Sequence, residues 1–195
     1  LEIVSEIMVR FPESTLALEM LERDEQIIVD DYVDGLISAE VFAKLTQSTN
    51  LVGGGMWASW YHPIVDAAIE RGGNIVAANS PRRYAKLARA CGFEAIEKLP
   101  ENRRWLVDFP KEPSGGVYKK RFWELAAHSA DDETMESFYR SQQVWDATMA
   151  RSVANAKPTL NQKVILLVGQ FHVEFEGGLV QELRRLLPSV NIMVV

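Results

Sequence analysis

Four polar residues lie at or just beyond the carboxyl ends of three apolar runs: Glu19, Asn79, Gln170 and His172. In an open parallel sheet, ligands bind outside the carboxyl ends of the strands, where the loops converge. If the three runs are neighbouring parallel strands, these side chains share one edge of the sheet. Histidine can act there as a metal ligand, a general base or an anion contact near neutral pH. We therefore expect the functional surface to centre on the turn Gly169–His172.

Each of these residues also has a purely structural explanation. Glu19 could be a buried acid paired with an arginine. Asn79 could serve only to shape the turn into the helix that follows Ser80-Pro81. For His172, which follows a glycine-containing turn, we favour a functional role over packing, because its imidazole can face a cleft.

An aromatic segment from Trp57 to Pro63 is the second candidate feature. It either lines a pocket large enough for a porphyrin or belongs to the core. The sequence has no C-x-x-C-H motif, which excludes covalent haem attachment of the c type. Non-covalent haem remains open, because histidine or tyrosine can bind its iron axially. The candidate axial ligands are Tyr61, Tyr118, Tyr139, His62 and His128.

Motifs of several other function classes are missing from the sequence. There is no G-x-S-x-G elbow, no P-loop lysine motif and no H-E-x-x-H, and Gly53-Gly54-Gly55 lacks the strand–helix context of a dinucleotide fingerprint. The net charge of −6 gives no support to nucleic-acid binding. Cys91 is the only cysteine, so neither an internal disulfide nor a thiolate zinc site is expected. No run approaches the roughly 20 apolar residues that span a bilayer.

The elements that must position these residues alternate between short apolar runs and helical patterns. This alternation predicts an α/β fold with a largely parallel central sheet, flanked by helices on both faces, in one domain over residues 1–195. The expected strands are Thr15–Met20, Asn74–Ala78, Lys163–Val168 and Asn191–Val195, with a short one at Trp105–Val107 in an otherwise irregular stretch from Phe93 to Gly116. Helices are expected between Ile3 and Pro12, over Glu22–Val33, Ser38–Leu45 and Trp60–Arg71, between Pro81 and Gly92, and over Val117–Ala127, Asp132–Ala154 and Gly178–Leu187.

Several short segments together resemble a known family. They are Leu18-Glu19-Met20, Glu22 to Gln26, Trp60 to Pro63, Ala77 to Arg82, Phe138 to Gln142, Trp145 to Ala150, Val168 to His172 and Gly177-Gly178. In their order and spacing these segments resemble the ChaN-type haem-binding lipoproteins, which are similar to the wider Tiki superfamily. The resemblance implies an α/β fold, a bacterial envelope location and a role in haem or iron uptake. The residues expected to contact the cofactor are Tyr61, His62, Asn79, Arg82, Tyr118 and Gln170.

The same superfamily includes metal-dependent hydrolases and erythromycin esterases, which implies an alternative function. Glu19 and His172 would then be the catalytic residues and would hold a divalent metal. The superfamily enzymes carry two Gly-x-x-His-type motifs, and only the later one matches, at Gly169–His172. The earlier one, Gly-Glu-x-His, is expected just before Leu1, so we expect the N-terminal motif segment to be missing. A homodimer, a lipid anchor upstream of Leu1 and a scaffold without chemistry also remain open.

Overall fold

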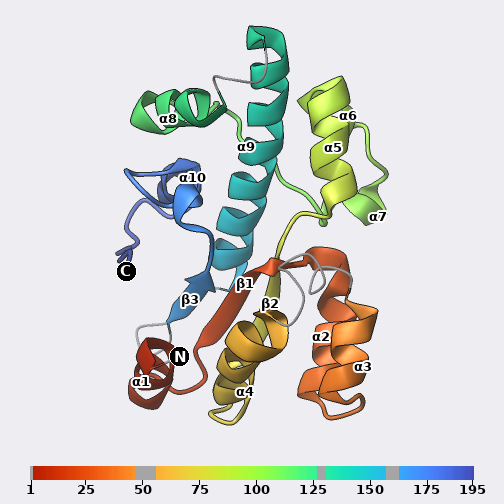
Figure 1. Cartoon of the computed structure of the whole chain (residues 1–195), viewed down its shortest axis with the longest axis vertical. Coiled ribbons are helices and arrows are strands. Elements are labelled where there is room, and N and C mark those ends of the chain that lie inside the picture. Colours follow the sequence, from red (N-terminus) through yellow and green to blue (C-terminus); the bar gives the residue numbers. More distant parts are fainter. Residues whose placement is uncertain (1, 47–55, 127–130, 157–162) are drawn as a thin grey trace. The chain divides into compact units, whose positions relative to one another are not determined.

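The computed structural model describes residues 2–46, 56–126, 131–156 and 163–195, and it divides the chain into two compact units (Figure 1). The first, which we call the sheet unit, contains Leu1–Asn79 and Asn155–Val168. The second, which we call the helical unit, contains Ser80–Ala154 and Gly169–Val195. A single domain over residues 1–195 stays a prediction, because each unit is described by itself.

Three parallel strands form the centre of the sheet unit: β1 (Thr15–Glu22), β2 (Asn74–Asn79) and β3 (Val164–Leu167), in the order β2-β1-β3. The consecutive residues Leu16, Ala17 and Leu18 of β1 are all fully buried. Successive side chains of a strand point to opposite faces, so β1 is covered on both. The predicted α/β class with a parallel sheet flanked by helices is confirmed.

The helices of the sheet unit are α1 (Glu2–Arg10), η1 (Arg23–Glu25), α2 (Gln26–Val33), α3 (Ala39–Leu45), the π-helical turn η3 (Trp57–Tyr61) and α4 (His62–Ile69). The apolar stripes of α1, α3 and α4 supply Met8, Phe42 and Val65 to the core around β1. Gln26 links α2 to β2 through two hydrogen bonds of its side-chain amide, which donates to the Ile75 carbonyl (3.0 Å) and accepts from the Ala77 N–H (2.7 Å).

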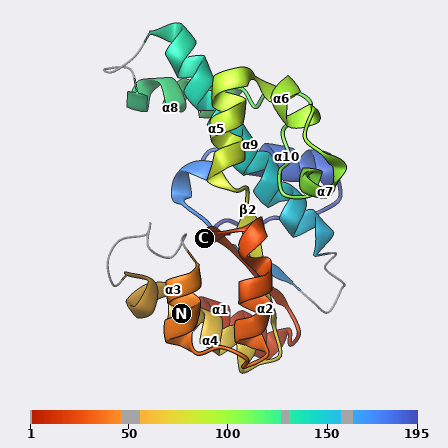
Figure 2. The ribbon, with the colours of Figure 1, turned by 90° about the vertical axis from the view of Figure 1, so that its right-hand side faces the viewer.

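The helices of the helical unit are α5 (Arg82–Cys91), α6 (Phe93–Glu97), α7 (Glu101–Arg104), α8 (Gly116–Ala126), α9 (Asp132–Asn155), η4 (Gln170–His172) and α10 (Gly178–Leu186). The long helix α9 is central to this unit, and α5 lies alongside it in both views (Figures 1 and 2). Ser141 of α9 donates a hydrogen bond to the Ala85 carbonyl of α5 (3.1 Å). The middle of α9 buries polar side chains as well as apolar ones, which is unusual for a core helix.

Two strand predictions were wrong. Asn191–Val195 is not in a strand, and the side chain of Val195 is 87% exposed. An apolar, β-branched run becomes a strand only where a neighbouring backbone offers a ladder of hydrogen bonds. Trp105–Val107 is a turn after α7, and the short helices α6 and α7 occupy much of the stretch predicted to be irregular. The predictions on Gly53-Gly54-Gly55 and His128 lie outside the described residues.

Candidate functional site

A buried polar cluster in the helical unit joins His172 of η4, Tyr118 of α8, and Gln142 and Asp146 of α9. We call these four residues the His172 cluster. Nδ1 of His172 lies 2.5 Å from Oδ1 of Asp146, and the Tyr118 hydroxyl donates to Oδ2 of the same carboxylate at 2.6 Å. Nε2 of Gln142 lies 2.9 Å from the Tyr118 hydroxyl and 3.0 Å from Nδ1 of His172. Two chain segments, η4 and α8, therefore converge on one carboxylate of α9.

The cluster is almost sealed from solvent. Asp146 is 1% exposed, Tyr118 is 2% exposed and His172 is 7% exposed. Burial, followed by the neighbouring charge of Asp146 and the hydrogen bond to it, raises the pKa of Tyr118 well above its ordinary value. The Tyr118 side chain is therefore a neutral phenol that donates its proton to Asp146. A buried carboxylate is tolerated only when it is hydrogen-bonded, and Asp146 accepts at both oxygens.

Two glycines allow the chain after His172 to approach this cluster. A Cβ atom at Gly177 would overlap the His172 carbonyl, and one at Gly178 would overlap Oδ2 of Asp146. The turn before them holds Phe175 (φ 53°) and Glu176 (φ 56°) in the left-handed region, which is costly for residues other than glycine. The backbone from His172 to Gly178 is thus folded tightly against the cluster.

Arg121 of α8 contacts two residues of the same turn, Glu174 and Phe175. Its Nη1 atom lies 2.6 Å from Oε2 of Glu174, and its guanidinium lies 4.5 Å from the centre of the Phe175 ring. Gln170 also donates to Glu174, at 3.0 Å. The hydrogen bond from Arg121 is the main cause that lowers the pKa of Glu174 below its ordinary value. Phe171 packs against the Tyr118 ring, with centroids 5.1 Å apart.

The sheet unit brings Glu19 and Asn79 together. The Asn79 amide donates to the Glu19 carbonyl at 3.0 Å, and both residues lie toward the carboxyl ends of their strands. Gln170 and His172 belong to the helical unit, so a common edge for all four residues stays a prediction. Arg82 is the exposed first residue of α5.

The aromatic segment divides between core and surface. Trp57 is buried in the core of the sheet unit and stacks on Tyr61, with centroids 5.8 Å apart, whereas Trp60 is 65% exposed. Nε2 of His62 lies 2.7 Å from the hydroxyl of Tyr32, which donates to Asp66 at 2.6 Å. Trp57 thus has the core role, while haem contacts by Tyr61 and His62 stay predictions.

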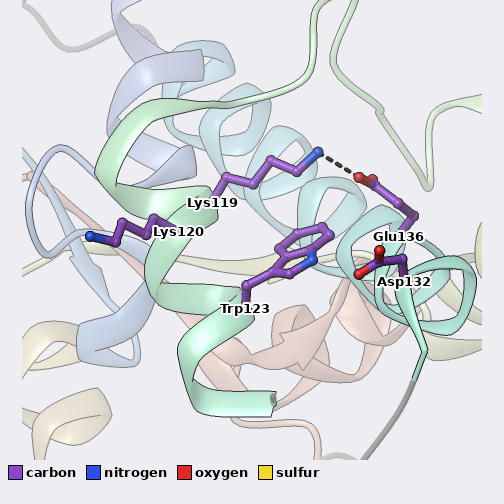
Figure 3. Close-up of a pocket in the computed structure, with 5 residues that line it drawn as sticks. All are labelled: Lys119, Lys120, Trp123, Asp132 and Glu136. Carbon is purple, nitrogen blue, oxygen red and sulfur yellow. Dashed lines mark hydrogen bonds and ion pairs between the residues drawn. The ribbon is translucent and has the colours of Figure 1, made fainter.

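A surface hollow of about 460 Å³ lies between α8 and α9. It is lined by Lys119, Lys120, Trp123, Asp132 and Glu136. Figure 3 shows Lys119 reaching across Trp123 to Glu136, with Nζ and Oε1 2.6 Å apart, while Lys120 points away. Among the residues that the structure describes, its lining contains no histidine, tyrosine, cysteine or methionine, the protein ligands that haem iron takes.

The part of the chain that the structure describes contains neither a cluster of metal ligands nor a membrane-spanning helix. Within it, no three or more histidine, cysteine, aspartate or glutamate residues gather closely enough to hold a metal ion. None of the helices in those residues has the length and apolarity needed to cross a membrane.

Asp146 and Gln142 are site residues that we did not predict from the sequence. They lie four positions apart in α9, so they share one helix face, which is otherwise part of the buried stripe. Polar residues at helical spacing within a core-facing stripe are the signal that could have identified them. Gln142 and Asp146 did fall in segments that carry the family resemblance, but no role was assigned to them.

Comparison with known proteins gives the family. Residues 1–183 match the family model described as "Haem-binding uptake, Tiki superfamily, ChaN". Among solved structures, the chain is similar to one described as "Cofacial heme binding to ChaN of Campylobacter jejuni", with a TM-score of 0.63 and 17% sequence identity, over 94% of this chain and 67% of that one. At 17% sequence identity, this similarity shows only that the two proteins share a fold. No curated protein matches the chain. The match to the family model spans most of the sequence, and the chain therefore belongs to the ChaN family of haem-binding uptake proteins in the Tiki superfamily.

Proposed function

We propose that this chain binds haem in bacterial haem or iron uptake and that His172 is the residue that meets the iron. The observation that carries the proposal is the family match over residues 1–183. The similar solved structure is described by cofacial haem binding, which is a statement about the Campylobacter jejuni protein. A ligand site at the carboxyl edge of the sheet, with Glu19, Asn79, Arg82 and Gln170 nearby, is part of the proposal.

The donor chemistry of the His172 cluster fits haem iron. Histidine is a common axial ligand of haem. A metal-bound imidazole almost always gives its other ring N–H to a carboxylate, a carbonyl or water, which fixes the ring and raises its basicity. Asp146 is placed to be such a carboxylate partner of His172, because its Oδ1 atom lies 2.5 Å from Nδ1. The bound haem would supply an iron centre, and this chain's own residues would hold and orient the imidazole.

Tyr118 suits a supporting role better than an axial one. A tyrosine binds ferric iron as a phenolate, whereas burial and the charge of Asp146 raise the pKa of Tyr118 well above its ordinary value. Moving the Tyr118 oxygen onto iron would also break its hydrogen bond to Asp146. Tyr61 and His62 remain the alternative ligands in the sheet unit.

A hemin titration tests the proposal. We expect the purified chain to give a saturable Soret shift and His172→Ala to lose it or to bind at least tenfold more weakly. His62→Ala is the competing variant, because His62 is the alternative imidazole ligand and also contacts a tyrosine; if His172 is the iron ligand, binding should persist in His62→Ala. No saturable binding by the unaltered chain would refute haem binding. If only His62→Ala lost hemin binding, the residue that binds the iron would be His62 of the sheet unit.

The biological setting is also proposed from the family resemblance. A bacterial envelope location, a homodimer and a lipid anchor upstream of Leu1 are expected for a haem-uptake protein of this kind. Sedimentation of the purified chain with and without hemin tests the dimer, since a second copy should double the mass.

A second candidate function is metal-dependent hydrolysis, and the His172–Asp146 pair is the observation that favours it. A carboxylate beside Nδ1 orients a metal-binding imidazole and raises its basicity. Glu19 and His172 would then hold a divalent metal that activates the water. The purified protein should contain stoichiometric metal and lose it in His172→Ala. Metal content that does not respond to this substitution would count against hydrolysis.

A further inference from the structure

The hollow between α8 and α9 already accommodates an ammonium group, that of Lys119. Its Nζ atom lies 2.6 Å from Oε1 of Glu136, 4.7 Å from the centre of the Trp123 ring and 5.6 Å from that of the Tyr139 ring. The two rings are set edge to face, with centroids 5.4 Å apart. Aromatic rings and a carboxylate around a cation are the chemistry by which proteins recognise organic ammonium ions. The hollow therefore suits an ammonium group.

A second carboxylate, that of Asp132, lines the same hollow. Asp132 lies four residues before Glu136 in α9, so the two side chains share one face of the helix. Figure 3 shows the Trp123 ring reaching from α8 toward this face. Within the part of the chain that the structure describes, Asp132 is exposed and forms no ion pair, whereas Glu136 is paired with Lys119. Asp132 is therefore the carboxylate that is left to bind a second cation.

The lysines of the hollow do not cancel the charge of Asp132. Lys119 neutralises Glu136, while Lys120 points away from Trp123, and its Nζ atom lies 3.8 Å from Oε1 of Glu124 in its own helix. The charge that remains in the hollow is negative, which favours a cationic ligand over an anionic one. The volume of about 460 Å³ is also large enough for a small molecule, since such sites measure about 300–1,000 Å³.

We propose that this hollow is a binding site for aliphatic ammonium ions, in which Asp132 binds the ammonium group of the ligand and the Trp123 ring packs against its carbon chain. An indole ring suits this role because its face is both apolar and attractive to cations. Lys119 occupies part of the site in the free chain, beside Glu136. The site is independent of the proposed haem function.

A titration with putrescine, a linear aliphatic diammonium ion, tests the site. Indole ¹H–¹⁵N NMR follows the Trp123 resonance, which Trp123→Phe assigns by its disappearance. We expect putrescine to shift this resonance saturably. Butanediol, which has the same carbon chain without charge, and succinate, a dianion of similar length, should leave it unchanged at equal ionic strength. No saturable shift with putrescine, or an equal shift with butanediol or succinate, would overturn the proposal.

Asp132→Asn tests the carboxylate that binds the ligand. We expect it to weaken putrescine binding by about two- to fivefold, the range for one exposed ionic contact. Glu133→Gln is the matched control, because Glu133 is the next exposed carboxylate of α9 and is not part of the lining of the hollow. Its affinity for putrescine should equal that of the unaltered chain. Equal weakening in both variants would show a response to general acidity alone and would refute a site at Asp132.

Lys119→Ala should have the opposite effect. Removing the internal ammonium group leaves Glu136 without its partner and opens the Trp123 face, so putrescine should bind more tightly, by about two- to fivefold for one added ionic contact. A hollow that binds anions would instead lose affinity for succinate with this lysine. Weaker or unchanged putrescine binding by folded Lys119→Ala would contradict the claim that Lys119 occupies an ammonium site.

Discussion

Replacing Gly178 with alanine should distort the His172 cluster from the α10 side. The added Cβ would overlap Oδ2 of Asp146 and lie 2.6 Å from Cε1 of Tyr118. Neither neighbour can move aside cheaply, because the ring and the carboxylate are buried and hydrogen-bonded to each other. Forcing a methyl group into a packed interior costs about 1–3 kcal/mol. The reduced freedom of alanine in the unfolded chain offsets about 0.4–1 kcal/mol of this.

We therefore expect Gly178→Ala to lower the free energy of unfolding by about 1.3 kcal/mol, within a range of about 0–2.6 kcal/mol, which is the overpacking cost less that offset. Urea unfolding followed by circular dichroism measures this, and the imidazole resonances of His172 should shift in the folded variant. Gly115→Ala is the matched control, because a Cβ there has no neighbour within 4 Å and its φ is not positive. A Gly178→Ala protein as stable as Gly115→Ala, with unchanged His172 resonances, would refute this account of the packing.

Two further substitutions probe the surroundings of the cluster. Tyr118→Phe removes the hydroxyl that donates to Asp146, and it should lower the free energy of unfolding in urea by about 1.5–3 kcal/mol, as expected for a buried hydrogen bond to a charged group. The variant should still bind hemin. If a folded Tyr118→Phe protein does not bind hemin, the phenol itself meets the iron. Arg121→Gln removes the partner that holds the pKa of Glu174 below its ordinary value. In the unaltered chain, the pairing of Arg121 with Glu174 stabilises the fold at neutral pH, and this stabilisation is lost as the pH falls below 4.5 and through the depressed pKa of the folded state. The difference in urea midpoint between Arg121→Gln and the unaltered chain should therefore shrink from pH 7 to pH 3, and a constant difference would mean that the contact with Phe175 dominates.

The strands that form the sheet could be predicted from the sequence, because burial on both faces requires a continuous apolar run such as Leu16 to Leu18. The same pattern misled at Asn191–Val195, since the composition of a run does not reveal whether a neighbouring strand is there to pair with it. The short helices α6 and α7 were missed for a related reason. They are each too brief to show a helical period.

Only part of the candidate site could be predicted from the sequence. His172 could be found because it follows an apolar run and a glycine, where side chains reach the end of a strand. Asp146 could not, because its contact with His172 depends on how α9 packs against η4 across 26 positions of sequence. The role of Tyr118 depended on the same packing. Its place in the sequence suggested an iron ligand, whereas its burial against Asp146 favours a support for one.

Pulsed EPR of the ferric haem complex, prepared from chain labelled with ¹⁵N-histidine, is the most direct test of the central claim. If His172 is the iron ligand, the spectrum should contain a strong hyperfine coupling to a directly bound imidazole nitrogen, and this coupling should vanish in His172→Ala but persist in His62→Ala. A saturable complex without any such nitrogen coupling would contradict the claim and indicate an oxygen ligand, for which Tyr61 would be the first residue to test.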